Sequence, residues 1–226
     1  MTVTTIRVLL ADDEAMVRAG LRLLIDNEPD LTVVGEAVDG AEAVAVAGRT
    51  APDVVLMDVR MPNVDGIEAA RQIIAARPEA RIVMLTTFRE DRYLQDALRA
   101  GVSGFLLKVS PPQQMLDAIR VVADGGGLLD PSVTLRVIET FSGQAGRTSR
   151  ADDLARLSPR ELDVLAFVAR GMSNAEVAAR LHIGEATVKT HVANFLMKLG
   201  LRDRVQAVAF AYESGLLRPG EPDTTG

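Results

Sequence analysis

Short apolar runs alternate with amphipathic segments along the first half of the chain, and this alternation limits the possible folds. Each run is rich in Val, Ile or Leu and ends near turn or charged residues, as buried strands do. The segments between the runs carry apolar residues at three- and four-residue spacing, which indicates helices. We predict strands over residues 6–11, 31–37, 53–57, 81–86 and 104–107, and helices over 14–27, 41–49, 66–77, 91–101 and 112–125. These β–α repeats predict an α/β domain, a five-stranded parallel doubly wound sheet with helices on both faces.

The last third of the chain carries helical patterns only. Two of its helices begin with a capping box, Ser158 with Glu161 and Ser173 with Glu176. Four short helices are predicted within residues 158–171, 173–184, 185–200 and 203–215. Together they predict a second, all-α four-helix domain.

The composition between and after these domains sets their predicted boundaries. Residues 131–142 carry the pattern of a connecting helix, and residues 143–153 are rich in Gly, Ser and charge, which is typical of a flexible linker. We predict a first domain over 1–125, a connecting helix and linker over 126–156, a helical domain over 157–217 and a disordered tail over 218–226.

Charge is distributed unevenly along the chain, whose net charge is −6. Residues 1–125 contain 13 Lys and Arg against 19 Asp and Glu, whereas residues 158–217 contain 7 against 6. This asymmetry indicates two domains with different partners. The chain has no cysteine, so it can form neither disulfides nor thiolate metal sites, and no apolar stretch reaches the length of a membrane span. We therefore expect a cytoplasmic protein without a membrane partner.

Polar residues follow several of the predicted strands of the first domain. Asp12 and Asp13 follow the first strand, Asp58 the third and Lys108 the fifth, while Thr86 ends the fourth. The carboxyl ends of parallel strands share one sheet edge, where ligands bind in such folds. Three clustered carboxylates would repel one another unless a hard cation neutralised them, and an oxygen-only ligand set suits Mg²⁺. Beside that ion, an Asp carboxylate can accept a phosphoryl group.

On these residues, the segment 6–124 resembles the receiver domain of bacterial two-component response regulators, which has a flavodoxin-like fold. The resemblance implies Mg²⁺ as cofactor and a sensor histidine kinase as partner. It also implies a local switch, in which a hydroxyl bonds the new phosphate and an aromatic ring moves from an outward to a buried position. The implied roles are phospho-acceptor for Asp58, metal ligands for Asp12, Asp13, Asp58 and the backbone carbonyl of Arg60, switch hydroxyl for Thr86, switch aromatic for Phe105 and phosphate contact for Lys108.

In the second domain, the tight turn at "HIGEA" predicts a helix-turn-helix whose second helix, "EATVKTHVANFLMKLG", would lie in a DNA major groove. Its apolar residues can form one face and leave short polar side chains and a lysine outward. Residues 157–217 also resemble the LuxR/FixJ-type helix-turn-helix. By position in that motif, bases would be contacted by Lys189, Thr190 and Ala193 or Asn194, and phosphates by Asn174, Thr187, His191 and Lys198.

The leading hypothesis is therefore a response regulator of the NarL/FixJ type, not an enzyme. A sensor histidine kinase would phosphorylate Asp58, and the receiver would form a homodimer that binds double-stranded promoter DNA. Two alternatives remain at this point. One is a Mg²⁺-dependent phosphohydrolase that uses an aspartyl-phosphate intermediate. The other is a LuxR-type regulator whose first domain binds an apolar signal.

Overall fold

The computed structural model describes residues 5–87, 91–129 and 151–217, and its contacts divide the chain into two compact units, Met1–Asp130 and Pro131–Gly226. The predicted helix over 131–142, most of the predicted linker and the predicted disordered tail lie outside the described residues. Within the part of the chain that is described, no helix is both long and apolar enough to cross a bilayer.

The first unit contains the strands and helices that the apolar periodicity predicts. Its strands are β1 (Ile6–Ala11), β2 (Leu31–Ala37), β3 (Val54–Asp58), β4 (Arg81–Thr86) and β5 (Gly104–Leu107). Its helices are α1 (Ala15–Asp26), α2 (Gly40–Thr50), α3 (Gly66–Ala76), α4 (Asp91–Ala100) and α5 (Pro112–Ala123). All strand pairs are parallel, in the order β2-β1-β3-β4-β5, so the predicted doubly wound α/β sheet is confirmed.

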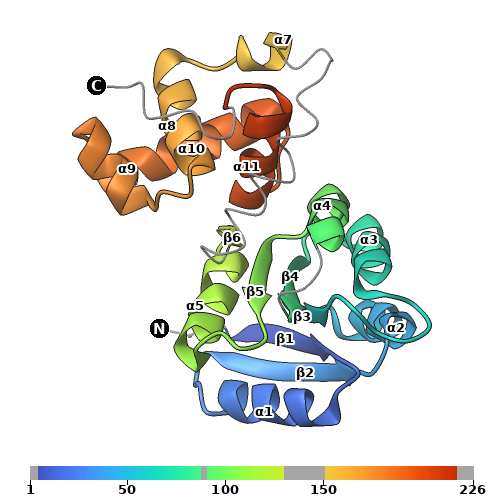
Figure 1. Ribbon diagram of the computed structural model, residues 1–226. Helices are drawn as coiled ribbons and strands as arrows, with labels where there is room; N and C mark the ends of the chain where they lie inside the picture. The colour runs from blue at the N-terminus through green and yellow to red at the C-terminus, as the bar shows by residue number, and fades with distance from the viewer. Residues whose placement is uncertain (1–4, 88–90, 130–150, 218–226) are drawn as a thin grey trace. The chain divides into compact units, whose positions relative to one another are not determined.

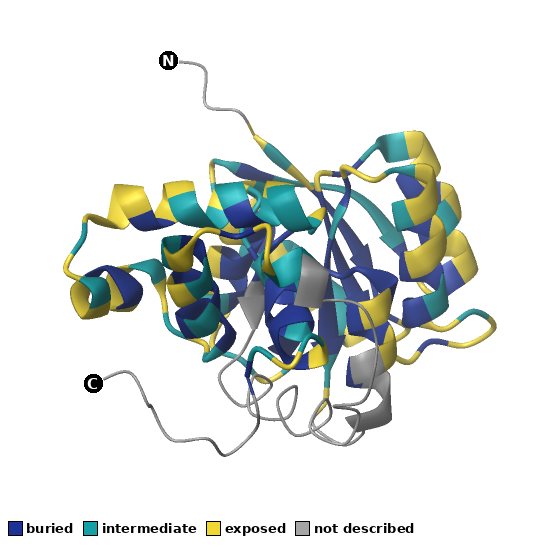
Figure 2. Ribbon diagram, turned by 90° about the horizontal axis from the view of Figure 1, so that it is seen from above, coloured by how far each residue is buried: buried dark blue, intermediate teal, exposed yellow. Residues whose placement is uncertain are grey.

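Helices cover both faces of this sheet (Figure 1). On the face of α1 and α5, a continuous apolar core joins Val8, Val54 and Val83 of three strands to Ile25 and Ile119 of the helices. On the other face α2 packs closely, because Gly35 of β2 has no Cβ to meet the side chain of Val46. Figure 2 shows the strands mostly buried and the helices exposed along their outward faces.

A sixth strand, β6 (Leu128–Leu129), extends the sheet beyond the five predicted strands. It pairs in parallel with β5, with Phe105 opposite Leu129. The chain turns into β6 through Gly125, whose φ of 79° suits glycine, and Gly126, where a Cβ would meet the Val121 carbonyl oxygen at 2.8 Å. A pair of leucines after three glycines is too short to show strand periodicity, so this strand could not be predicted from an alternating pattern.

The second unit is all helical among its described residues, as predicted. It contains α7 (Ala151–Leu154), α8 (Pro159–Ala169), α9 (Asn174–Leu181), α10 (Glu185–Leu199) and α11 (Arg204–Glu213). Both predicted capping boxes are present, at Ser158 with Glu161 and at Ser173 with Glu176. The one-turn helix α7 corrects the prediction for residues 151–153, which were assigned to the flexible linker.

Gly66 shows how closely the helices approach the sheet. It begins α3, and a Cβ at this position would lie 1.9 Å from the backbone oxygen of Asp58. No real Cβ tolerates that distance, and the atom it meets is backbone, which cannot rotate away. Any larger residue at position 66 must therefore displace α3 or the end of β3.

We expect Gly66→Ala to lower the free energy of unfolding by about 3 kcal/mol, the upper range for overpacking. The matched control is Gly48→Ala in α2, where nothing lies within 4 Å of the added Cβ. That variant should gain about 0.5–1 kcal/mol through helix propensity. Urea titration followed by far-UV circular dichroism measures both, and equal stabilities would contradict the prediction.

Candidate functional site

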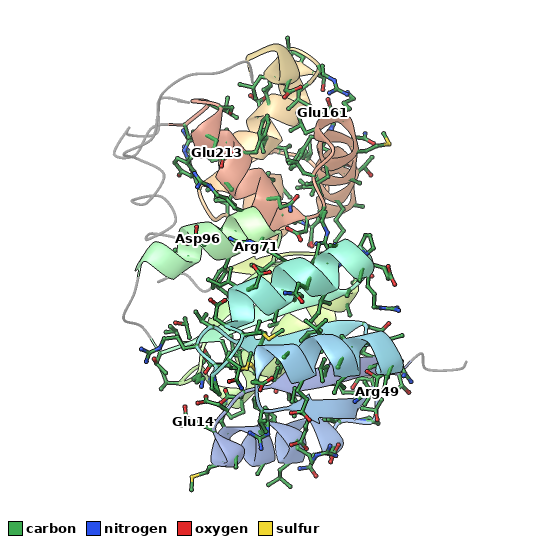
Figure 3. All side chains as sticks on the ribbon, turned by 90° about the vertical axis from the view of Figure 1, so that its right-hand side faces the viewer. Glu14, Arg49, Arg71, Asp96, Glu161 and Glu213 are labelled. Carbon is green, nitrogen blue, oxygen red and sulfur yellow. The ribbon has the colours of Figure 1, made fainter. Side chains whose placement is uncertain are left out.

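Strand register brings the predicted acids to one edge of the sheet. Ala11, the last residue of β1, pairs with Met57, so Asp12 and Asp58 follow at the same level of neighbouring strands. In Figure 3, Glu14 marks this edge and Arg49, at the end of α2, lies at the opposite edge. Both Asp12 and Asp58 are buried, with 1% and 7% of their surface exposed.

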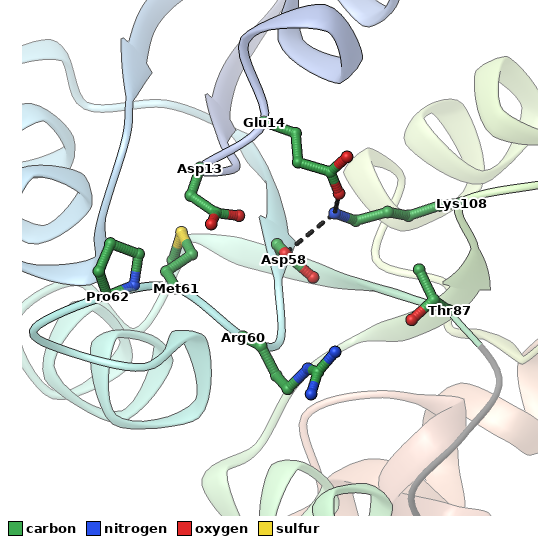
Figure 4. A pocket seen from close by; sticks show the side chains of 8 residues that line it. All are labelled: Asp13, Glu14, Asp58, Arg60, Met61, Pro62, Thr87 and Lys108. Atoms are coloured by element: carbon green, nitrogen blue, oxygen red, sulfur yellow. Dashed lines mark hydrogen bonds and ion pairs between the residues drawn. The ribbon is translucent and has the colours of Figure 1, made fainter.

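The ammonium of Lys108 lies among these carboxylates. Its Nζ is 2.8 Å from Asp12 Oδ2, 2.9 Å from Asp58 Oδ2 and 3.1 Å from Glu14 Oε1. Figure 4 shows Lys108 reaching Glu14 on one side and Asp58 on the other. The Lys108 side chain is itself only 8% exposed, so a buried cation balances buried anions.

Burial and charge act in opposite directions on the pKa values of this pair. Burial raises the pKa of Asp58 above its ordinary value, although the hydrogen bond and charge of Lys108 oppose the rise. Burial also lowers the pKa of Lys108, but its hydrogen bonds to Asp12 and Asp58 outweigh that effect and hold the pKa well above its ordinary value. Lys108 is therefore a permanent cation in this site.

A pocket of about 430 Å³ opens over Asp58. Its lining includes four residues of the predicted site, which are Asp13, Asp58, Arg60 and Lys108. Glu14 and Thr87 also line it and were not predicted. Each directly follows a predicted site residue, Asp13 or Thr86. Their position next to these residues in the sequence was the one feature that could have indicated them. Met61 and Pro62 complete the wall.

Two predicted switch residues take definite positions. Thr86 ends β4 half-buried, and its carbonyl oxygen accepts a hydrogen bond from Lys108 N at 2.9 Å, while Thr87 is the threonine that lines the pocket. The Phe105 ring is buried, with 2% of its surface exposed. A buried ring is one of the two positions that the predicted switch gives to Phe105.

The donor set of the pocket fits a hard divalent cation. Asp12, Asp13 and Asp58 each offer a carboxylate oxygen, and these three atoms lie within 4.8 Å of one another. Carboxylate oxygens are the ligands that Mg²⁺ prefers, usually together with waters. The metal ligands predicted from side chains are therefore together at one point.

The predicted DNA-contacting residues fall into two groups. Thr187, Lys189 and Thr190 are exposed on α10, and His191 and Asn194 are half-buried on the same helix. Opposite them, Val188 and Phe195 are buried in the unit's core. The three exposed side chains are accessible to another molecule.

Lys198 and Asn174 form the second group, because each is held by a side chain from another helix. Lys198 Nζ lies 2.6 and 2.9 Å from the two carboxylate oxygens of Glu161, which is only 4% exposed. Asn174 Oδ1 accepts a hydrogen bond from Arg204 Nη1 at 3.2 Å. Glu161, expected only to cap α8, therefore also ties α8 to α10.

Comparisons with known proteins agree with this architecture. Residues 8–120 match the family described as response regulator receiver domain, and residues 155–211 match that described as bacterial regulatory proteins, luxR family. The chain is 45% identical over 215 residues to the uncharacterized transcriptional regulatory protein YxjL of Bacillus subtilis, an alignment that covers 94% of this chain and 98% of YxjL.

Two solved structures are also similar over most of the chain. One is the crystal structure of response regulator ChrA from a heme-sensing two-component system, with a TM-score of 0.53 and 36% sequence identity. The match covers 95% of this chain and 100% of the ChrA chain. A structure of two RcsB dimers bound to two parallel DNAs has a TM-score of 0.56 and 25% identity, over 92% of this chain and 98% of that one.

The charge balance of the pocket predicts the effect of removing its cation. We expect Lys108→Met to lower the free energy of unfolding by about 3 kcal/mol, because two buried carboxylates lose their partner. Adding Mg²⁺ should restore more stability to this variant than to the wild type. The exposed Lys189→Met is the matched control and should change stability little. Urea titration with and without Mg²⁺ measures this, and equal effects of the two substitutions would contradict it.

The Glu161–Lys198 pair predicts a pH dependence of stability. The hydrogen bonds of Lys198, followed by the backbone hydrogen bond of Ser158, hold the pKa of Glu161 below its ordinary value. Because this pKa is lowered, ionised Glu161 makes its full contribution to the free energy of unfolding above the unfolded pKa of about 4.3. That contribution is lost as the pH falls through the folded pKa.

We expect Glu161→Gln to lose about 2 kcal/mol at neutral pH and to flatten the acid side of the stability profile, because the amide can still cap α8 but cannot pair with Lys198. Glu185→Gln, at an exposed position of α10, is the control. Thermal unfolding from neutral to acid pH tests this, and parallel profiles for Glu161→Gln and wild type would refute it.

Proposed function

Because the chain belongs to the response regulators of the LuxR family, we propose that Asp58 accepts a phosphoryl group from a sensor histidine kinase. The receiver unit then changes conformation and forms a homodimer, and the paired helix-turn-helix units bind promoter DNA and regulate transcription. The observation that carries this proposal is the Asp58 carboxylate at the floor of an open pocket, 2.9 Å from the Lys108 ammonium.

The chemistry is a single phosphoryl transfer. A carboxylate oxygen of Asp58 attacks the phosphorus of a phosphohistidine, forming a P–O bond as the P–N bond breaks, and the imidazole nitrogen leaves with the electron pair. Lys108 balances the added charge on the phosphoryl oxygens. Asp12, Asp13, Asp58 and the backbone carbonyl of Arg60 would hold Mg²⁺, which neutralises the same oxygens.

The proposed switch acts through Thr86 and Phe105. A hydrogen bond from the Thr86 hydroxyl to the new phosphate would draw the segment after β4 inward and favour the buried Phe105 ring. Phosphorylation would need only to shift the population between the outward and the buried positions of the ring.

DNA binding is assigned to α9 and α10. Thr187, Lys189 and Thr190 are exposed on α10, where short polar groups and a cation can meet base edges and phosphates. His191 and Asn194 on the same helix and Asn174 on α9 are the further proposed contacts, whereas Lys198 would contact a phosphate only while paired with Glu161. The RcsB dimers on DNA support this assignment by similarity.

The two alternative hypotheses fit the comparisons less well. The match of residues 155–211 to regulatory proteins favours a regulator over a phosphohydrolase. The match of residues 8–120 to receiver domains favours a phosphoryl signal over an apolar one.

The test is incubation of the full chain with acetyl phosphate and Mg²⁺. We expect the intact mass to rise by one phosphoryl group and the protein to become a dimer by light scattering, both absent in Asp58→Asn. Asp65→Asn, in the same loop region but outside the pocket, is the control and should behave as wild type. A mass gain retained by Asp58→Asn, or no gain in the wild type with any phosphoryl donor, would overturn the proposal.

A further inference from the structure

Arg204 holds a side chain at the start of α9. It is the first residue of α11, thirty residues from Asn174 in sequence. Its Nη1 donates to Asn174 Oδ1 at 3.2 Å, and its Nη2 donates to the backbone oxygen of Met172. Burial lowers the pKa of Arg204 to about 10, so the group is still a cation at neutral pH. One guanidinium therefore anchors both the chain leading into α9 and the first side chain of that helix.

The chemistry of arginine fixes which way the Asn174 carboxamide faces. A guanidinium has only donors, so the Asn174 atom that it meets must be the oxygen and not the nitrogen. The nitrogen, with both of the side chain's N–H donors, then occupies the other branch of the planar amide. Among the described residues, no acceptor takes a hydrogen bond from it. Asn174 is half-buried, so part of this residue remains accessible to another molecule.

The location of this amide matches a phosphate rather than a base. In helix-turn-helix proteins the first helix crosses the DNA backbone, and helix N-termini favour anions through their backbone N–H groups and dipole. Asn174 begins α9, the first helix of the motif, and the charge of Arg204 lies directly behind it. A phosphate at this point would meet an oriented donor and the positive end of the helix dipole, while the Glu176 carboxylate in the same turn opposes the charge of Arg204.

We propose that Arg204 is a positioning residue for DNA binding, which orients the Asn174 amide so that its nitrogen donates to a DNA phosphate. The inference rests on the proposed function, because it assumes that α9 meets DNA. The proposal gives different roles to the two pairs that join helices, Lys198 with Glu161 and Arg204 with Asn174. The Lys198 ammonium is neutralised by a carboxylate, whereas Asn174 is oriented by a cation and keeps its donors.

The decisive variant is Asn174→Asp. Aspartate keeps an oxygen for Arg204 and suits the first turn of a helix, so the fold should be at least as stable as the wild type. It lacks the N–H donors and adds a negative charge toward the phosphate. If Asn174 only tied α9 to α11, aspartate would serve equally well. If it contacts phosphate, affinity should fall by more than about ten-fold, the cost of one charge-assisted hydrogen bond.

The probe is a duplex of about 30 base pairs, long enough for two half-sites, recovered from a random library by the acetyl phosphate-treated wild-type chain. Fluorescence anisotropy gives Kd at several salt concentrations. Asn174→Ala should weaken binding about ten-fold with the salt slope unchanged, because a neutral amide displaces no counterion. Lys189→Gln, by contrast, removes a cation from the proposed DNA-binding surface and should lower the slope, by up to about one if the ammonium also neutralises a phosphate.

A double-mutant cycle tests whether Arg204 acts through Asn174. Arg204→Met should weaken binding several-fold in the wild type and much less in the Asn174→Ala background. Arg204→Lys, which keeps a cationic donor, should recover part of the loss. Arg156→Met removes an exposed cation of the same unit and controls for charge alone. Circular dichroism melting of each variant checks the fold.

The outcomes separate the two proposals. If no duplex binds the wild type, the proposed DNA-binding function fails and this inference with it. If DNA binds but Asn174→Asp matches the wild type, or Arg204→Met costs as much without the Asn174 amide as with it, only the positioning role of Arg204 is overturned.

Discussion

The ion pairs of Lys108 are the interactions on which the candidate site depends. Two like charges about 4 Å apart at the effective dielectric near a protein surface repel by about 4 kcal/mol, and Asp12 and Asp58 are both buried. The compensating ammonium comes from the end of β5, whereas the acids follow β1 and end β3. The charge balance therefore exists only when three strands are in register. A group added to Asp58 alters the contacts of Lys108. Because Lys108 also pairs with Asp12 and Glu14, the change reaches the end of β1 as well.

Much of the fold and most of the acidic site could be predicted because both follow from repeating geometry. Apolar periodicity fixes the long strands and helices, and a parallel sheet brings the ends of its strands together, so Asp12, Asp58 and Lys108 had to meet. The two-residue β6 and the one-turn α7 are too short to have a period, and β6 forms by pairing with β5. Which of two adjacent threonines lines the pocket depends on the course of the chain after β4, and a sequence pattern does not specify it.

The same reasoning explains what was missed in the helical unit. Helical periodicity shows which face of α10 is exposed, but not which side chain of another helix reaches its end. Lys198 looks like a free surface cation in sequence, and the crossing of α8 and α10 brings Glu161 to it. Arg204 likewise looks like the first polar residue of a capped helix. Its contact with Asn174 depends on how α11 approaches α9, thirty residues earlier.

These cations have different consequences because their partners differ. Lys108 and Lys198 each meet carboxylates, so their charge is largely cancelled and the net result is a fixed geometry. Arg204 donates its hydrogen bonds to a carbonyl and an amide oxygen, which are neutral, and the charge that acts on it comes from Glu176 in the first turn of α9. A cation paired with an anion stabilises a structure, whereas a cation paired with neutral oxygens also leaves a field that attracts a further anion. The start of α9 therefore offers a phosphate an oriented amide donor, whereas the end of α10 offers an ammonium that a carboxylate already binds.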